Sequence, residues 1–300
     1  MANRPKPVPQ MTAAQFEARF PIGDDEACLR YLVARRWPEG VHCPRCGNTD
    51  LYDASSYKPF HWQCRACAPQ GYRFSALAGT IFENTKKPLR DWYRVAHLML
   101  ASKKGMSALQ IQRFMGFGSY NTAHLMCHKI RAALIAPEQK LGGIVEIDDT
   151  WIGGKDKNRH WNKRRHSATK GKTPLIGAVE RQGNVVVRVL KRVNSQTMLD
   201  FVNEAVSNKV SLLATDSWPG YSDYLRHLPH QKVDHHRGQY VVGAVHTNTI
   251  EGFWSIFKRG VVGTFHKMSA KYMPLYVAEF QFRYNNRFNP NMFETAIAGC

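Results

Sequence analysis

The second half of the chain alternates apolar β-type runs with helical segments, and their order restricts the fold more than any other feature. Strands are predicted over residues 144–152, 174–181 and 184–191, with Gly183-Asn184 as the turn between the last two. A helix then begins, for which Ser195 is a suitable N-cap. A strand, a short helix, a strand and two closing helices follow, over residues 210–215, 221–228, 231–236, 248–259 and 269–287. This order predicts an α/β fold in which helices flank a mixed five-strand sheet.

The first 140 residues have a different character and predict separate domains. Residues 1–40 are predicted to form a tail and short helices, and residues 41–75 are rich in Cys, Gly and aromatic side chains. Helical spacing returns over residues 76–140. We place the main boundary in the APEQKLGG segment near residue 140, so that the α/β domain covers residues 141–300.

The charge of the chain favours a polyanionic partner. Forty-two Lys and Arg face 23 Asp and Glu, which gives a net charge of +19. Each phosphate that such a surface neutralises releases counterions, so nucleic acid is favoured over a membrane surface or a merely soluble basic surface. No window approaches 18 uninterrupted apolar residues, and the Pro-rich start lacks an apolar signal core. We therefore expect no membrane contact and a cytoplasmic location.

Four of the seven cysteines form the motif C-x2-C-x17-C-x2-C. They are Cys43, Cys46, Cys64 and Cys67. Each C-x2-C turn places two thiolates on one side of a tight knuckle, and two knuckles close a tetrahedral four-sulfur site. A redox dithiol would need only one pair. The motif predicts a zinc ribbon with one structural Zn²⁺ and no open coordination position.

Two helices that follow the ribbon have the layout of a DNA-reading pair. Ser107 can cap the first, Gly116 to Gly118 break it, and Ser119 can cap a second helix that continues through Ala133. An ordinary helical hairpin is the alternative. The polar face of the second helix offers Tyr120, Asn121, His124, His128, Lys129 and Arg131. From this set we take Asn121, His124 and Lys129 as candidate DNA contacts.

Three acidic residues predict a site for divalent cations. Asp148 lies in the apolar run IVEIDDTWI, Asp216 ends VSLLATD, and Glu251 follows after 34 further residues. Two strand-end carboxylates and a third on a helix can hold two cations about 4 Å apart, which is a recurring way to cut and rejoin phosphodiester bonds. Strand alternation places Glu146 with Asp148 on one face and turns Asp149 to the other. Taken singly, a strand-end Asp is usually a cap and a helical Glu is usually solvated.

Basic and polar residues accompany these acids. Glu251 and Lys258 share one face of their predicted helix, so Lys258 is suited to grip a phosphate beside the metal-bound one. Asn248 and Arg259 on the same helix are further candidate DNA contacts. Residues 155–172, between the first two strands, contain eight Lys and Arg and one Asp. This segment is either a solvated loop or a clamp on the DNA backbone, with Lys163, Arg164 and Arg165 as its candidate contacts.

The chain resembles a bacterial insertion-sequence transposase of the DDE class, in the subgroup with an N-terminal zinc ribbon and an ISXO-like DDE domain. The motifs that carry the resemblance span about residues 20–290: CPRCG, CRAC, TIFENTKKPLRDWY, VEIDDTWIGGKDKN, ATDSWPGY, HTNTIEGFWSIFKRGVVGTFHKMS and EFQFRYNNR. The resemblance implies a ribonuclease-H-like core, dependence on two Mg²⁺ or Mn²⁺ ions, and cleavage at terminal inverted repeats followed by strand transfer. It also implies double-stranded DNA as partner and a homodimer or larger assembly on it.

The resemblance assigns roles to individual residues. It implies that Asp148, Asp216 and Glu251 are the catalytic metal ligands and that Lys258 assists them. Asp149 stands where Glu is common in the family, so the choice between Asp148 and Asp149 as first ligand stays open. Two other functions also stay open: a ribonuclease-H-like nuclease without strand transfer, and a non-catalytic DNA-binding regulator derived from a mobile element. A regulator would not need the three acids.

Overall fold

The computed structural model describes residues 10–67, 69–154, 156–158, 160–164, 167, 169–216, 228–233 and 246–300. The chain divides into two compact units. The sheet unit contains residues 103–105 and 135–288, and the helical unit contains residues 10–102, 106–134 and 289–300. The last residues of the chain, which were expected in the α/β domain, therefore fold with the helical unit.

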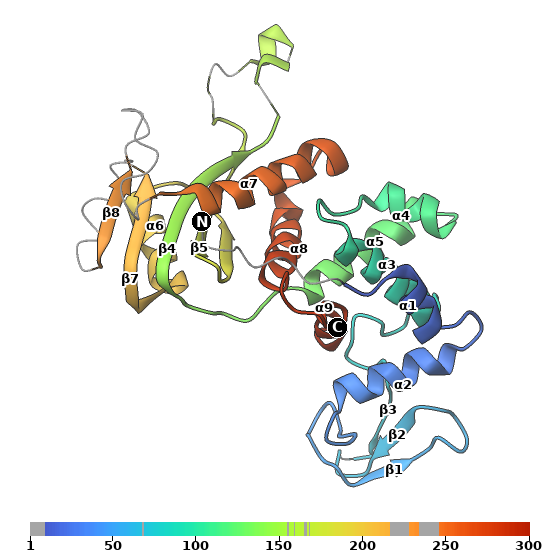
Figure 1. Ribbon diagram of the computed structural model, residues 1–300. Helices are drawn as coiled ribbons and strands as arrows, with labels where there is room; N and C mark the ends of the chain where they lie inside the picture. Colours follow the sequence, from blue (N-terminus) through green and yellow to red (C-terminus); the bar gives the residue numbers. More distant parts are fainter. Residues whose placement is uncertain are drawn as a thin grey trace. The chain divides into compact units, whose positions relative to one another are not determined.

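A five-strand mixed sheet forms the centre of the sheet unit (Figure 1). Its strands are β4 (Leu141–Ile152), β5 (Thr173–Glu180), β6 (Val185–Val189), β7 (Val206–Asp216) and β8 (His230–Val233). The strand order is β6-β5-β4-β7-β8, with antiparallel pairing from β4 to β6 and parallel pairing from β4 through β7 to β8. The predicted ribonuclease-H-like sheet is confirmed. The helix predicted over residues 221–228 and the end of the fifth predicted strand lie outside the described residues, apart from Leu228.

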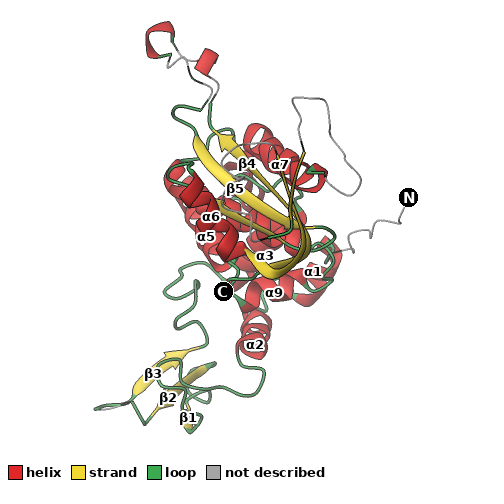
Figure 2. Ribbon diagram, turned by 90° about the vertical axis from the view of Figure 1, so that its left-hand side faces the viewer, coloured by secondary structure: helices red, strands yellow, loops and turns green. Residues whose placement is uncertain are grey.

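Strand alternation separates the core of the sheet unit into two layers. Val145 and Ile147 of β4 pack with α6 (Ser195–Ala205) on one face of the sheet. Ile152 of β4 packs on the other face with α7 (Asn248–Gly260) and α8 (Met273–Asn285). Figure 2 shows α6 and α7 on opposite sides of β4 and β5. The two faces of β4 therefore belong to different helical layers.

Two helix starts differ from the sequence prediction. The N-cap of α6 is Asn194, whose side chain accepts a hydrogen bond from the Thr197 amide, so the predicted cap at Ser195 was wrong by one residue. Asn194 is the N-cap because its side chain accepts a hydrogen bond from the Thr197 amide, and the Thr197 side chain accepts one from the Asn194 amide, which together form a capping box. The last helix, predicted from residue 269, begins as a 3₁₀ turn over Ala270–Tyr272 and becomes α-helical at Met273.

The exposed edge of the sheet is closed by side chains of α8. The Val187 amide donates to Gln281 Oε1 at 2.9 Å, and the Val185 amide donates to Asn285 Oδ1 at 2.7 Å. Asn285 Nδ2 returns a hydrogen bond to the Val185 carbonyl at 3.0 Å. An unpaired edge strand is a template for pairing with other chains, so these contacts satisfy β6 where the sheet ends.

The helical unit is built around an aromatic core. It contains α1 (Ala13–Arg19), α2 (Asp25–Arg36), α3 (Leu89–Ala101), α4 (Ala108–Met115), α5 (Tyr120–Ala133) and the C-terminal α9 (Met292–Ala298). Phe16, Phe20, Tyr93 and Phe293 pack with ring centroids 5.0–6.3 Å apart. Phe293 comes from α9, which explains why the end of the chain belongs to this unit. None of the helices in the described part of the chain is long and apolar enough to cross a bilayer.

The helix pair α4 and α5 has the predicted caps. Ser107 and Ser119 both accept hydrogen bonds from the first turns of their helices, and Gly116 ends α4 in the left-handed conformation with φ of 66°. The polar face of α5 is narrower than predicted, because His128 and Arg131 are 8% and 1% exposed. Both lie on the side of α5 that packs into the helical unit, which the spacing of polar residues alone did not reveal.

The cysteine-rich segment folds as a three-strand sheet. Its strands are β1 (Leu51–Asp53), β2 (His61–Cys64) and β3 (Tyr72–Ser75), paired antiparallel in that order. The third strand follows the second C-x2-C knuckle. Trp37, Trp62 and Phe74 form the small apolar core beside the cysteines. So little buried surface predicts that the segment needs a further cross-link to be stable.

Candidate active site and metal centre

The pairing of β4 with β7 brings two of the predicted acids together. Glu146 pairs with Ala214 in parallel register, and Asp148 and Asp216 each lie two residues further along their strands. Residues at the same level on neighbouring parallel strands point to the same face of a sheet. The two aspartates therefore lie side by side on adjacent strands, Asp216 at the last residue of β7 and Asp148 four residues before the end of β4.

Helix α7 covers the same face and carries the third acid. Gly177 on β5 pairs with Asp148, and a Cβ atom at Gly177 would lie 2.8 Å from the Trp254 ring and 3.1 Å from Ile250. The absence of a side chain at Gly177 thus lets α7 approach the sheet closely. Glu251, in the first turn of α7, is brought against the strand that carries Asp148.

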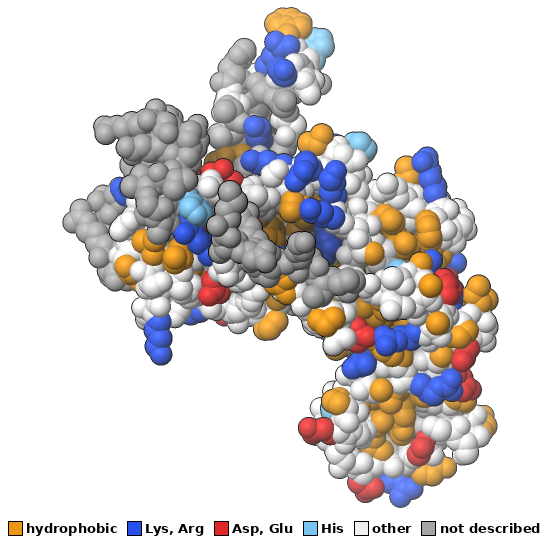
Figure 3. All heavy atoms as spheres, viewed as in Figure 1, with side chains coloured by type: hydrophobic (Ala, Val, Ile, Leu, Met, Phe, Trp, Pro, Cys, Tyr) orange, Lys and Arg blue, Asp and Glu red, His pale blue; other side chains and the backbone are white. Residues whose placement is uncertain are grey.

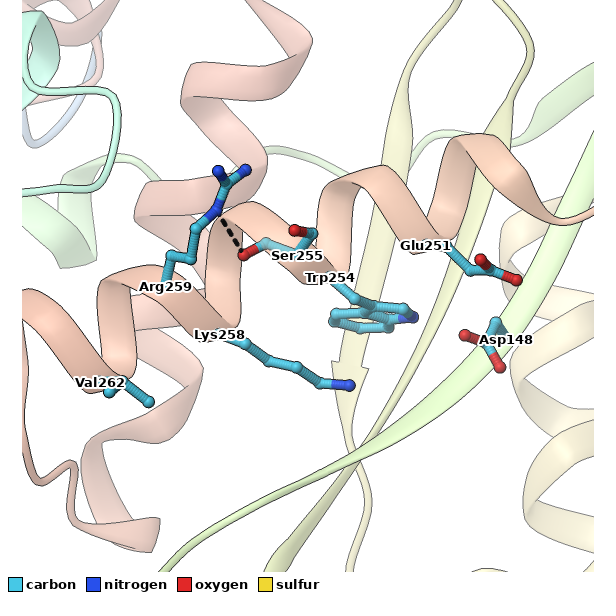
Figure 4. A pocket seen from close by; sticks show the side chains of 7 residues that line it. All are labelled: Asp148, Glu251, Trp254, Ser255, Lys258, Arg259 and Val262. Carbon is cyan, nitrogen blue, oxygen red and sulfur yellow. Dashed lines mark hydrogen bonds between the residues drawn. The ribbon is translucent and has the colours of Figure 1, made fainter.

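Asp148 and Glu251 line one open hollow of about 570 Å³. The other residues that line it are Trp254, Ser255, Lys258, Arg259 and Val262. Figure 4 shows the two carboxylates directed toward the same space, with the Lys258 side chain extended from α7 on that side. Thr247 Oγ1 donates a hydrogen bond to Glu251 Oε1 at 2.9 Å, which fixes one oxygen of the helical acid.

Burial and neighbouring acids change the ionisation of Asp148 and Asp149. The pKa of Asp148 is raised to about 7, mainly by burial and further by the charges of Asp149, Asp216 and Glu251. The pKa of Asp149 is raised as well, mainly by burial and then by Asp216, while Trp151 and Lys258 oppose the shift. Asp148 is therefore coupled electrostatically to both other acids of the predicted triad.

Basic side chains flank the hollow. Lys258 and Arg259 both line it, and Arg259 Nε donates to the Ser255 carbonyl at 3.2 Å. Figure 3 shows Lys and Arg side chains gathered on this face over the C-terminal half of α7. Asn248, at the start of the same helix, is exposed. A hollow with acids at one end and cations along α7 is suited to a bound metal ion and a phosphate next to it.

The other predicted DNA contacts have different surroundings. Asn121 is exposed and His124 is half-buried on α5, with the His124 ring 4.2 Å from that of His128. Lys129 donates instead to the Ile81 carbonyl at 3.0 Å, so its amino group is turned into the helical unit. In the basic segment Arg164 is exposed, Lys163 lies in a 3₁₀ turn, and Arg165 is outside the described residues.

One buried acid in this region received no role from the sequence. Glu146 is fully buried on β4, on the same face as Asp148, and it contacts Arg181 and the first turn of α7. One signal was present in the sequence, because alternation places this Glu on a face that a helix is expected to cover. Its partners lie 35 and 103 residues away in the chain, so they could not be named from the sequence.

The four cysteines of the ribbon form a metal site. Their four Sγ atoms all lie within 4.8 Å of one another. The Sγ–Sγ distances are 3.7 Å for Cys43–Cys67, 3.6 Å for Cys46–Cys64 and 3.5 Å for Cys46–Cys67. Tetrahedral Zn–S bonds of about 2.3 Å require about 3.8 Å between sulfurs, so the quartet fits one structural zinc ion.

Comparison with protein families identifies both parts of the chain. Residues 140–285 match the model of the ISXO2-like transposase domain, and residues 23–70 match the transposase zinc-ribbon domain. A relative is an uncharacterised protein in transposable element ISH50 of Halobacterium salinarum. It is 27% identical over 245 residues, which cover 76% of this chain and 80% of the relative.

A structural comparison matches a chain of a simian T-cell lymphotropic virus intasome, solved by cryoEM in complex with PP2A regulatory subunit B56 gamma. The match has 16% identity and a TM-score of 0.30, and covers 64% of this chain and 65%, just under two thirds, of that chain. So low a score carries no argument.

The fold and the two matched domains define a transposase with a ribonuclease-H-like domain and a zinc ribbon. The chain carries the ISXO2-like transposase domain together with the transposase zinc ribbon, and it is similar in both to insertion-sequence transposases.

The zinc site generates a first prediction. Replacing Cys64 by Ser should abolish stoichiometric zinc and unfold the ribbon, because binding of about 10–16 kcal/mol supplies the folding energy of such small units. Metal analysis and limited proteolysis of residues 41–76 measure both effects. Cys300→Ser, outside the quartet, is the control and should retain one zinc per chain. Full zinc content in Cys64→Ser would contradict the four-thiolate site.

The raised pKa of Asp148 generates a second prediction, for zinc-loaded protein in buffer free of Mg²⁺ and Mn²⁺ and without a chelator. Between about pH 4 and pH 7 the folded state keeps a proton on Asp148 that the unfolded state has released, so wild-type stability falls as pH rises through this range. Asp148→Asn removes this loss and should raise the free energy of unfolding at pH 8 by about 1–2 kcal/mol, since the carboxyl group is partly open to solvent.

Urea unfolding at pH 4.5 and pH 8 measures this effect. The gain should disappear at the lower pH, and Mg²⁺ should stabilise the wild type but not Asp148→Asn. Asp200→Asn, at an exposed acid on α6, is the control and should show neither change. Equal gains at both pH values would mean that Asp148 is not destabilised by its charge.

Proposed function

We propose that this chain is the active transposase of its insertion sequence, which binds terminal inverted repeats and cuts and joins DNA with two Mg²⁺ or Mn²⁺ ions. The observation that carries the proposal is the convergence of Asp148, Asp216 and Glu251 from two adjacent strands and the helix over them. The chain's similarity to insertion-sequence transposases supports the same function. A DNA-binding regulator would gain nothing from partly buried acids that repel one another.

The acids fit a pair of divalent cations. Burial, and then repulsion by the neighbouring acids, raises the pKa of Asp148, and a bound cation would offset that cost. Asp148 responds to both Asp216 and Glu251, so it is our candidate for the ligand that both ions share. Two bound Mg²⁺ ions would activate the attacking water or 3′-hydroxyl and stabilise the leaving oxygen. Lys258 would hold a neighbouring phosphate from the same hollow.

DNA would be held by basic and polar residues in both units. We propose Asn248, Lys258 and Arg259 on α7 as contacts beside the acids, and Lys163, Arg164 and Arg165 as contacts to the backbone. In the helical unit we propose Asn121 and His124 on α5, and we leave out Lys129 because its amino group bonds to Ile81. An insertion sequence has two ends, and each needs an active site, so we expect a homodimer or larger assembly on DNA.

The acids provide the decisive experiment for this proposal. Asp148→Ala, Asp216→Ala and Glu251→Ala should each reduce cleavage of end DNA by about 1,000-fold or more, because two cations cannot be held together without these charges. Affinity for end DNA should stay nearly unchanged, since removing an anion reduces repulsion of phosphate. A cleavage and strand-transfer assay with Mg²⁺ and the element's ends measures the first effect, and gel shift in Ca²⁺ measures the second.

Asp149→Ala is the matched control and should be much milder, because Asp149 alternates to the α6 side of β4. Equal loss in Asp149→Ala would make Asp149 the first ligand instead. Full activity of Glu251→Ala would reject the three-acid site. Cleavage without joining by the wild type would favour the nuclease over the transposase.

The basic segment provides a further prediction. Changing Lys163, Arg164 and Arg165 to Gln should make the slope of log K against log salt shallower by up to about three, since each phosphate contact contributes about 0.9. Fluorescence anisotropy with labelled end DNA from 50 to 300 mM KCl measures the slope. Lys140→Gln with Lys209→Gln is the control, because these exposed lysines lie at the starts of β4 and β7, away from Asp216. An unchanged slope in the triple variant would leave the segment outside the DNA path.

A further inference from the structure

Glu146 occupies a position where a charge is costly unless it is fully satisfied. It lies on β4 two residues before Asp148, and it is 0% exposed. A buried carboxylate without partners would be neutralised or would destabilise the fold by several kcal/mol. The partners of Glu146 therefore show what the residue does for the structure.

The carboxylate of Glu146 caps helix α7 from the neighbouring strand. Its Oε2 accepts hydrogen bonds from the amides of Thr249 at 2.7 Å and Ile250 at 3.2 Å, and its Oε1 accepts one from Thr249 Oγ1 at 2.9 Å. These amides belong to the first turn of α7, whose N–H groups have no partner within the helix. The N-cap residue Thr247 makes no side-chain hydrogen bond to them. A negative charge at this end of the helix is also favoured by its dipole.

Arg181 completes the junction from the end of β5. Its Nε donates to Glu146 Oε1 at 2.7 Å, and its Nη2 donates to the His246 carbonyl at 3.1 Å. The guanidinium thus balances the buried charge and also holds the backbone just before α7. His246 Nδ1 lies 3.2 Å from the same Glu146 oxygen. The carboxylate of Glu146 on β4 thus contacts both Arg181, directly after β5, and the start of α7.

This junction sets the position of the third acid relative to the first. Glu251 follows Ile250 directly in the helix, and Asp148 follows Glu146 by two residues in the strand. We propose that Glu146 is a positioning residue for the cation site: by fixing the first turn of α7 to β4, it sets the separation between the carboxylates of Glu251 and Asp148. This inference rests on the proposed function, because the separation matters only if both acids bind the same pair of cations.

A buried ion pair that only stabilises the fold would have a different signature. The sheet unit offers such a pair in Glu279 and Arg283 on α8, which are 0% and 8% exposed. Glu279→Gln removes a buried charge of the same kind without touching the start of α7. It is therefore the matched control for Glu146→Gln, which keeps the shape of the side chain but loses its charge.

The test compares Glu146→Gln with wild type and with Glu279→Gln in the full-length chain. Glu146→Gln should speed hydrogen exchange of the amides at residues 248–251 and raise the Mn²⁺ concentration for half-maximal cleavage of end DNA by about 10-fold. Its affinity for end DNA in Ca²⁺ should stay within about twofold of wild type. Glu279→Gln should lower the melting temperature and leave the Mn²⁺ requirement unchanged. A Mn²⁺ titration followed by electron paramagnetic resonance gives the same comparison without catalysis.

Thr249→Val provides a second variant in case Glu146→Gln folds poorly. It removes one hydrogen bond to Glu146 and keeps the buried charge, so the Mn²⁺ requirement should rise by about threefold. A wild type that neither binds Mn²⁺ nor cuts end DNA would overturn the proposed function and this inference with it. A functional wild type with an unchanged Mn²⁺ requirement in Glu146→Gln and Thr249→Val would overturn this inference alone.

Discussion

The parallel pairing of β4 with β7 is the constraint on which the rest of the site depends. It places Asp148 and Asp216 at the same level on one face, and a shift of one residue in either strand would turn one of them to the α6 side. The apolar residues of both strands maintain this register, because Val145, Ile147 and Leu213 must remain in the core under α6. The apolar packing on the α6 face of the sheet thus determines which acids point to the α7 face.

The acid cluster opposes the stability of the fold that holds it. Burial and mutual repulsion raise the pKa of Asp148 to about 7, so the ionised cluster destabilises the chain at neutral pH. Nearby, Glu146 is more deeply buried but has Arg181 and the amides of α7 as partners. The difference between the two acids is that one is satisfied within the protein, whereas the other is directed into an open hollow where a cation can satisfy it.

The zinc site and the proposed cation site have opposite designs. The cysteine quartet surrounds its ion with four thiolates, leaves no position for a substrate, and cross-links a segment whose own core is small. The carboxylates stand at the edge of a large sheet core that does not need them for folding, and they face a hollow lined also by Lys258 and Arg259. A closed site suits a structural role, and an open site suits a reaction that we propose takes place on DNA.

The sequence by itself determined the elements that local patterns encode. Alternation predicted the five strands, the cysteine spacing predicted the zinc site, and serine caps with glycine predicted α4 and α5. Only the tertiary structure decided how distant segments meet. It placed α9 with the helical unit, buried His128 and Arg131, turned Lys129 toward Ile81, and joined Glu146 to Arg181 and α7. Hydrophobic periodicity is a property of neighbouring residues, whereas the partners of the buried Glu146 are determined by packing between segments up to 104 residues apart.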